Sequence, residues 1–382
     1  MQYRRCPIEV ESPEELGYSA IKYNLAESSI WDARLGDLNL DLKDLILAYT
    51  EHRGKTALRE VLAEQYGVAP DDVLIAPGAA AALFMVNTAL LGPNSSIVVV
   101  RPNYSTNIEV PRLLPCSVIC LDLIFEDQYQ LDLAKVESLI QPETRLISVT
   151  YPHNPSGAVI SEEDLCELIQ IAERHDCKLL VDETYRDLHR GNMPRLAAAI
   201  SPRAISVASM SKAYGMPGIR IGWVVSRDPE LQRLLLAAKE QIFLCGSVVD
   251  EEIALRVLQM RDRLLPAIRT QVEQNCRAVA EWMDHQPALE WVPPIGGVVC
   301  LPRIREDVLI DLAAFYAILL DQLSTYVGPG HWFEMSDRSF RLGFGWEPFD
   351  KLKIGLTNIS TALDAAIGVS KTSCTSGSRK TI

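Results

Sequence analysis

Residues 209–223 read SMSKAYGMPGIRIGW. Lys212 in this stretch follows two serines, precedes small residues and stands eight positions before Arg220. A lone lysine is usually a solvated surface cation, but an amine in such a setting can form a Schiff base with an aldehyde cofactor. Nearby serine and arginine side chains can hold a phosphate. The stretch therefore predicts a site in which Lys212 works beside a phosphate group.

Composition limits the possible functions. The chain has 382 residues, of which 48% are hydrophobic, enough for a large core in two or three domains. A formal net charge of -13 argues against a nucleic-acid or anionic membrane partner, since both favour a basic surface. Nine cysteines without a C-x-x-C pair indicate reduced thiols rather than disulfides or a zinc site. With no signal peptide and no apolar run of transmembrane length, we expect a cytoplasmic protein.

Short apolar runs rich in β-branched residues alternate with amphipathic stretches in the middle of the chain. One such stretch, Ser161–His175, opens with a Ser-x-x-Asp helix start. The pattern predicts an α/β fold whose large domain has a mainly parallel seven-stranded sheet flanked by helices. Ligands of such sheets bind at the carboxyl ends of the strands. The predicted strands are Val73–Ala76, Ser96–Arg101, Ser117–Leu123, Arg145–Tyr151, Lys178–Asp182, Ala204–Ala208 and Gly222–Ser226.

The pattern changes near Val248, where a long helical stretch runs to about His285. Short β segments and two further helices, at about 309–323 and 351–366, follow it and predict a smaller α+β domain. We expect residues 1–48 to join this small domain, residues 49–247 to form the large domain and residues 248–367 to complete the small one. Residues 368–382, rich in serine, threonine and lysine, are predicted to be a disordered tail.

Two segments that follow predicted strands could bind a flat, phosphorylated ligand. Gly78, Ala79 and Ala80 open a helix whose backbone amides could bind an anion, although an alanine-rich start also reflects plain helix propensity. Tyr104 could stack on a heterocycle, or it could be an ordinary half-buried aromatic residue.

Two further strand ends carry polar side chains. Asn154, in the sequence YPHNPSG, could donate to a phenolate oxygen, and the adjacent His153 is either a base or a structural loop residue. Asp182 could pair with a protonated ring nitrogen and keep it charged, whereas its alternative role is a helix cap. Tyr185 could donate to the same phenolate as Asn154. Each residue is weak evidence alone, but their order and spacing along the strand ends make a single shared site the better interpretation.

In this order of motifs the chain resembles the fold-type I, pyridoxal-phosphate-dependent aminotransferases of class I/II, from about Tyr49 to Ile367. The resemblance implies an aspartate-aminotransferase-like fold, pyridoxal 5'-phosphate as cofactor, and an amino acid and a 2-oxo acid as substrates. It also implies a homodimer in which Tyr49 reaches the phosphate of the neighbouring subunit. By this resemblance, Lys212 forms the Schiff base and carries the proton, Asp182 pairs with the ring nitrogen, and Asn154 and Tyr185 bind the ring oxygen. Tyr104 stacks on the ring and Arg341 binds the substrate carboxylate. The residues implied to bind the phosphate are Gly78, Ala79, Ala80, Ser209, Ser211 and Arg220.

The sequence departs from the commonest family pattern at residues 24–32, NLAESSIWD, where many members carry a glycine-containing loop followed by Glu-Pro. The chain also has a partial likeness to capreomycidine synthase, a member that cyclises its substrate instead of transaminating it. The sequence therefore predicts a ping-pong transaminase, with elimination or cyclisation as the alternative. One of the acidic residues Glu27, Asp32 and Glu334 could lie near the substrate and favour a basic amino acid. The alternative is that these residues are solvated surface acids.

Overall fold

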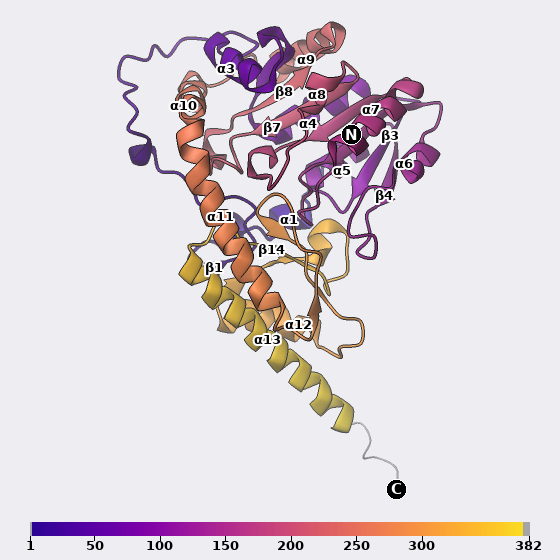
Figure 1. Cartoon of the computed structure of the whole chain (residues 1–382), viewed down its shortest axis with the longest axis vertical. Coiled ribbons are helices and arrows are strands. Elements are labelled where there is room, and N and C mark those ends of the chain that lie inside the picture. The colour runs from indigo at the N-terminus through magenta and orange to yellow at the C-terminus, as the bar shows by residue number, and fades with distance from the viewer. Residues whose placement is uncertain (1, 377–382) are drawn as a thin grey trace. The chain divides into compact units, whose positions relative to one another are not determined.

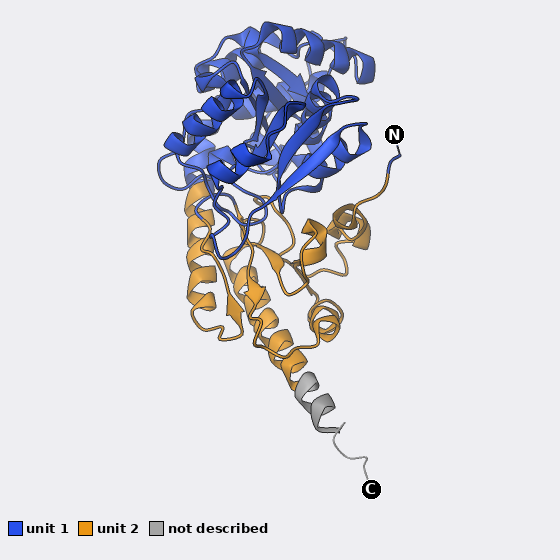
Figure 2. Ribbon diagram, turned by 90° about the vertical axis from the view of Figure 1, so that its right-hand side faces the viewer, with its two compact units in different colours: residues 1–3, 32–268, 295–297 blue, residues 4–31, 269–294, 298–382 orange. Residues whose placement is uncertain are grey.

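The computed structural model describes residues 2–376, with side chains through residue 368. The chain forms two compact units, which are blue and orange in Figure 2; Figure 1 labels its helices and strands. Unit 1 contains residues 2–3, 32–268 and 295–297, and unit 2 contains residues 4–31, 269–294 and the chain from residue 298 onward. The domain boundaries predicted at 48/49 and 247/248 both fall inside unit 1.

A seven-stranded mixed sheet forms the centre of unit 1, with strand order β2-β8-β7-β6-β5-β3-β4. Strand β8 is antiparallel to both of its neighbours, and the remaining pairs are parallel. This arrangement confirms the predicted mainly parallel seven-stranded sheet. The strands are β2 (Val73–Ala76), β3 (Ser96–Arg101), β4 (Ser117–Asp122), β5 (Thr144–Thr150), β6 (Lys178–Asp182), β7 (Ala204–Ser209) and β8 (Gly222–Ser226).

Helices of unit 1 bury their apolar sides against this sheet. Leu83 and Val86 of α4 and Leu235 of α9 belong to one core cluster with Ile205 and Val224 of the sheet. Several helices begin at a residue whose side chain accepts a backbone N–H; Ser161 caps α7 in this way, as its Ser-x-x-Asp sequence predicts. The helices are α3 (Thr56–Tyr66), α4 (Gly78–Leu90), α5 (Ser105–Leu113), α6 (Leu133–Leu139), α7 (Glu162–Arg174), α8 (Ala197–Ile200), α9 (Pro229–Ile242) and α10 (Val248–Gln259).

Unit 2 contains small sheets and long helices. Its three-stranded sheet has the order β10-β14-β13, and two strand pairs, β1-β12 and β11-β9, accompany it. The strands are β1 (Tyr23–Asn24), β9 (Leu289–Glu290), β10 (Val299–Cys300), β11 (Arg303–Ile304), β12 (Thr325–Tyr326), β13 (Gly328–Pro329) and β14 (Phe340–Gly343). The helices are α1 (Pro7–Val10), α2 (Pro13–Leu16), α11 (Arg261–Met283, which begins in unit 1), α12 (Leu312–Ala317) and α13 (Phe349–Ser376).

Two helical predictions differ from the structure. The stretch 248–285 forms two helices rather than one, because α10 ends at Gln259 and α11 begins at Arg261 after the intervening Met260. Helix α13 continues to Ser376, ten residues beyond the predicted end at Ala366, and so includes part of the predicted tail. Residues 377–382 of that tail lie outside the described residues. No helix in the described part of the chain has both the length and the apolarity needed to cross a membrane.

Candidate active site

The ends of three adjacent parallel strands place most of the predicted site residues at one edge of the sheet. Strands β5, β6 and β7 are neighbours, with Thr150 in register with Asp182 and Asp182 in register with Val207. The turns that carry Asn154, Tyr185 and Lys212 follow directly after these strands. Because the strands run in the same direction, the three turns leave the sheet at the same edge.

Asp182 is a buried carboxylate held by several donors. It is 4% exposed. Its Oδ1 accepts hydrogen bonds from Thr184 Oγ1 at 2.6 Å and Thr184 N at 3.1 Å, and its Oδ2 accepts one from Asn107 Nδ2 at 3.2 Å. Burial raises the pKa of Asp182, and these donors and the charge of Lys212 oppose that rise. A buried carboxylate of this kind suits a cationic partner such as a protonated ring nitrogen.

Further polar residues, which the sequence pattern did not predict, form hydrogen bonds around Asp182. Asn103 Oδ1 accepts hydrogen bonds from Thr150 Oγ1 at 2.9 Å and from Asn107 Nδ2 at 3.2 Å. It also accepts one from the backbone N–H of Tyr104 at 2.8 Å, at the start of α5. The sequence does contain a signal for these residues. Asn103 and Asn107 are four positions apart at a helix start, so their side chains lie on the same face of the helix.

The loop after β5 shows which role His153 has. His153 is fully buried, its Nε2 lies 2.8 Å from the carbonyl oxygen of Pro102 and its Nδ1 lies 2.7 Å from Ser156 Oγ. Burial lowers the pKa of His153 to about 4, so that the ring is neutral and donates to the carbonyl. These contacts support the structural alternative. The adjacent Asn154 is also buried.

Tyr185 is buried against a glycine. A Cβ added to Gly297 would lie 3.4 Å from Cγ of Tyr185, and Gly297 has a φ of +72°. The backbone at this glycine therefore lies close to the tyrosine ring.

The predicted phosphate ligands meet at the first turn of α4. A Cβ added to Gly78, whose φ is +80°, would lie 2.5 Å from Nη2 of Arg220, so the guanidinium packs against this helix start. A Cβ added to Gly222 would lie 2.6 Å from the carbonyl carbon of Gly78 and 2.7 Å from the nitrogen of Ala79. Glycine at 222 thus allows β8 to approach the backbone of Gly78 and Ala79 in the first turn of α4. An amide-lined helix N-terminus beside an arginine fits a phosphate group.

The serines lie beside this helix start. Ser209, the last residue of β7, pairs with Gly222 in the sheet, and its Oγ accepts a hydrogen bond from the backbone N–H of Ser211 at 3.4 Å. Lys212 follows in a turn and is partly buried.

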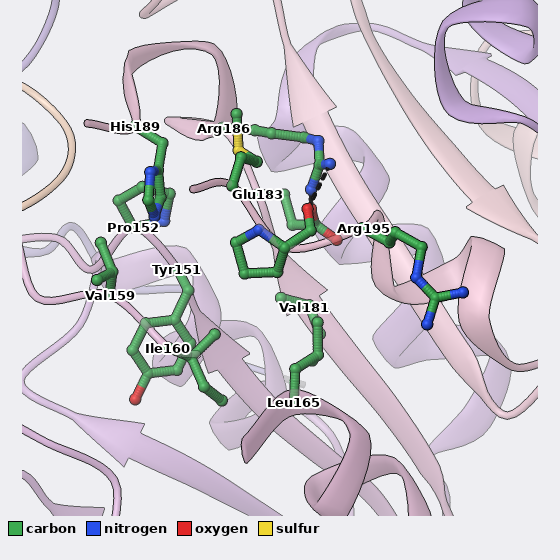
Figure 3. A pocket seen from close by; sticks show the side chains of 12 residues that line it. Tyr151, Pro152, Val159, Ile160, Leu165, Val181, Glu183, Arg186, His189 and Arg195 are labelled. Atoms are coloured by element: carbon green, nitrogen blue, oxygen red, sulfur yellow. Dashed lines mark hydrogen bonds and ion pairs between the residues drawn. The ribbon is translucent and has the colours of Figure 1, made fainter. Parts of the chain in front are cut away.

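A separate small cavity near these strand ends is shown in Figure 3. Its walls include Tyr151, Pro152 and His189, together with Glu183 and Arg186, which form an ion pair at 2.6 Å. The cavity measures about 20 Å³, room for a single water molecule, and no predicted cofactor ligand lines it. It is therefore distinct from the cofactor site.

Two of the remaining predicted residues belong to unit 2 and one to unit 1. Arg341 and Glu27 belong to unit 2, where Arg341 Nη2 donates to the carbonyl oxygen of Ala26 at 2.6 Å. The Arg341 guanidinium lies 5.8 Å from the ring centre of Trp332 and 5.2 Å from that of Phe333. Glu27 Oε1 accepts a hydrogen bond from the N–H of Ser28 at 2.8 Å. Tyr49 belongs to unit 1 and is 84% exposed.

The fold and these strand-end residues define a pyridoxal-phosphate-dependent enzyme, and comparison with known proteins gives its family. The model of the aminotransferase class I and II family matches residues 31–348, and the chain belongs to this family. Two curated relatives are capreomycidine synthase of Streptomyces vinaceus, 28% identical over 91% of each chain, and an arginine–pyruvate transaminase of Pseudomonas aeruginosa, 30% identical over 78% of this chain and 79% of the relative.

A solved structure, a PLP-dependent aminotransferase from Streptococcus suis, matches with a TM-score of 0.88 and 27% identity over 96% of this chain and 99% of its own. These findings confirm the predicted family, the aspartate-aminotransferase-like fold and pyridoxal phosphate as cofactor. The buried carboxylate of Asp182 and the helix start beside Arg220 fit the ring and the phosphate of that cofactor.

Proposed function

We propose that the protein is a transaminase that moves an amino group between an L-amino acid and a 2-oxo acid by a ping-pong mechanism. The carrying observation is the buried, hydrogen-bonded Asp182 at the same sheet edge as the turn of Lys212. Pyridoxal phosphate, when bound, supplies an aldehyde that exchanges amines and a ring that accepts electrons.

In this proposal each side chain has a defined role. Lys212 would hold the aldehyde and, once displaced by the substrate amine, would carry the proton from the substrate Cα to the former aldehyde carbon of the cofactor. Asp182 holds the proton of the ring nitrogen. Asn154 and Tyr185 donate to the ring oxygen and Tyr104 stacks on the ring, while Arg341 binds the substrate carboxylate through its fork of donors.

A basic amino acid is the proposed donor. The support is the name of one relative, an arginine–pyruvate transaminase, together with the acidic residue Glu27 in the segment that departs from the commonest family pattern. A carboxylate facing the substrate would stabilise a cationic side chain. Glu27→Gln tests this point: the ratio of kcat/KM for arginine to kcat/KM for leucine should fall. An unchanged ratio would remove Glu27 from the proposal.

The second candidate function is elimination or ring closure on a basic amino acid. It is supported by the similarity to capreomycidine synthase, which extends over 91% of this chain. Both reactions begin with proton removal at Cα by the same residues and differ in whether a leaving group departs afterwards.

One experiment separates the two functions. The purified protein is mixed with single amino acids without a 2-oxo acid, and the absorbance of the bound cofactor and the masses of the products are followed. Transamination predicts aminated cofactor and one equivalent of 2-oxo acid per active site. Release of a cyclic or dehydrated product, with the aldehyde form of the cofactor retained, would instead establish the second candidate.

We also propose that the protein is a homodimer. Large apolar side chains in one segment of unit 1 are well exposed: Ile46 by 79%, Leu47 by 76% and Tyr49 by 84%. Exposed apolar groups of this size favour burial against a partner, and a second copy could bring Tyr49 to the cofactor phosphate. Sedimentation of wild type and of Ile46→Asp tests the proposal. A wild-type monomer at micromolar concentration would contradict it.

A further inference from the structure

The turn that carries Lys212 contains one buried tyrosine, Tyr214. Residues 211–215 lie between β7 and the short 3-10 helix η4 (Pro217–Ile219) and belong to neither element. One backbone hydrogen bond, from Met216 N to Met210 O at 3.3 Å, closes the turn. Tyr214 is the bulkiest residue in the turn and is 3% exposed. The contacts of its side chain therefore influence where the backbone of Lys212 lies.

The hydroxyl of this tyrosine is bound to a buried carboxylate. The Tyr214 hydroxyl donates to Oδ2 of Asp187 at 2.6 Å, and Nη2 of Arg261 donates to Oδ1 of the same carboxylate at 3.1 Å. Asp187 is itself buried, and the positive charge of Arg261 balances it. Hydrogen bonds to an ionised acceptor are short and strong, so this contact restrains the tyrosine.

Asp187 also belongs to the other catalytic turn. It lies in the 3-10 helix η3 (Arg186–Leu188), which begins directly after Tyr185. The carboxylate thus joins the turn of Lys212 to the turn of Tyr185, the two segments that the proposed function assigns to the aldehyde and to the ring oxygen of the cofactor. Burial and the neighbouring Asp187 raise the pKa of Tyr214 well above its ordinary value, so its hydroxyl remains a donor throughout the physiological pH range.

We propose that Asp187 is a positioning residue, which acts through Tyr214 to place Lys212 relative to Tyr185. The proposal rests on the proposed role of Lys212. Small displacements of a reacting group cost large factors in rate, whereas a purely structural contact would affect folding alone.

A double-mutant cycle tests the proposal with Tyr214→Phe, Asp187→Asn and the combined variant. The control is Tyr316→Phe in unit 2, which removes a tyrosine hydroxyl that donates to the carbonyl oxygen of Asp337 at 2.9 Å. Three quantities are measured for each protein: kcat and KM, the dissociation constant of pyridoxal phosphate, and the urea midpoint of the cofactor-free protein.

We expect each single variant to lower kcat by about 10- to 100-fold with a smaller change in KM. The combined variant should be little slower than the singles, because both remove the same contact. Tyr316→Phe should shift the urea midpoint and leave kcat unchanged. Weaker cofactor binding by Tyr214→Phe alone would support the same conclusion if Asp187→Asn fails to fold.

The proposal is overturned if Tyr214→Phe shifts the urea midpoint as Tyr316→Phe does but keeps kcat and cofactor binding within twofold of wild type. Failure of the proposed role of Lys212 looks different. In that case Lys212→Ala would leave the absorbance of the bound cofactor unchanged, whatever the Tyr214 and Asp187 variants do.

Discussion

Asp182 in unit 1 and His331 in unit 2 both have raised pKa values, but for opposite reasons. Burial raises the pKa of Asp182 because it penalises the charged carboxylate. Burial alone would lower the pKa of His331; hydrogen bonds to Glu11 and Asp337 more than compensate and raise it. A bound cation would therefore stabilise the charged form of Asp182 in unit 1, whereas the imidazolium of His331 in unit 2 already has two carboxylate partners. The first arrangement suits ligand binding, and the second suits structure.

Replacing Lys212 should have the largest effect on turnover and tests the proposed function of the unit 1 site. Lys212→Ala should lower kcat by at least about 10²–10⁴-fold, since it removes both the covalent attachment and the proton carrier. It should also remove the visible absorbance of lysine-bound cofactor, while circular dichroism remains that of the folded protein.

Lys135→Ala, on the exposed side of α6, is the matched control for loss of a lysine. It should keep both the absorbance and the turnover. Equal turnover in the two variants would exclude Lys212 from the reaction.

The next effect concerns the donors around Asp182. Asn107→Ala removes one donor to the carboxylate, and because that donor lowers the pKa of Asp182, the pKa should rise further. We expect kcat to fall by about tenfold, in keeping with the loss of a hydrogen bond to a charged group. The acid limb of the pH–kcat profile should move to higher pH.

Asn87→Ala provides a comparison, since it removes a buried amide that donates to the carbonyl oxygen of Leu83 within α4. It should reduce stability without moving the pH profile. An unshifted acid limb in Asn107→Ala would mean that Asn107 does not tune Asp182.

How much the sequence predicts depends on how local the determining contacts are. The bounds of β6 and β8 are predicted to the residue, because each strand is a continuous apolar run. The break at Met260 has no glycine or proline to mark it and was missed. Roles of single motif residues follow from chemistry and family resemblance. The contacts of Asn107 with Asp182 and of His331 with Glu11 join positions 75 and 320 residues apart, and only the folded chain brings them together.

A smaller effect is expected at the phosphate end of the unit 1 site. Gly222→Ala would place a Cβ 2.6–2.9 Å from backbone atoms of Gly78, Ala79 and Ala208, which must then move. We expect pyridoxal phosphate to bind several-fold more weakly and the protein to lose about 1–3 kcal/mol of stability, as in other overpacked sites. Gly92→Ala, with no atom within 4 Å of the added Cβ, should change neither. Unaltered cofactor affinity in Gly222→Ala would contradict the assignment of the phosphate to this helix start.

The smallest effect belongs to unit 2 and should appear in stability as a function of pH. His331 Nε2 lies 2.8 Å from Glu11 Oε2, and its Nδ1 lies 2.8 Å from Asp337 Oδ1. The indole N–H of Trp332 donates to the same Glu11 oxygen at 2.8 Å, so the cluster fastens the segment after α1 to η6 (Gly330–Phe333). Because the folded pKa of His331 is raised, its stabilisation is fully present below the unfolded pKa and is lost as pH rises through the folded pKa.

The difference in urea midpoint between wild type and His331→Gln should therefore be largest near pH 6 and shrink towards pH 9. The side chains of His331 and Glu11 are each about 40% exposed, so solvent and salt should keep the effect small and weaken it at high ionic strength. Glu11→Gln should reproduce part of the loss at pH 6, since it leaves the imidazolium with Asp337 alone. A midpoint difference that stays constant from pH 6 to pH 9 would show that the His331 cluster stabilises unit 2 through packing rather than charge. His331 and Asp182 would then differ only in how deeply they are buried.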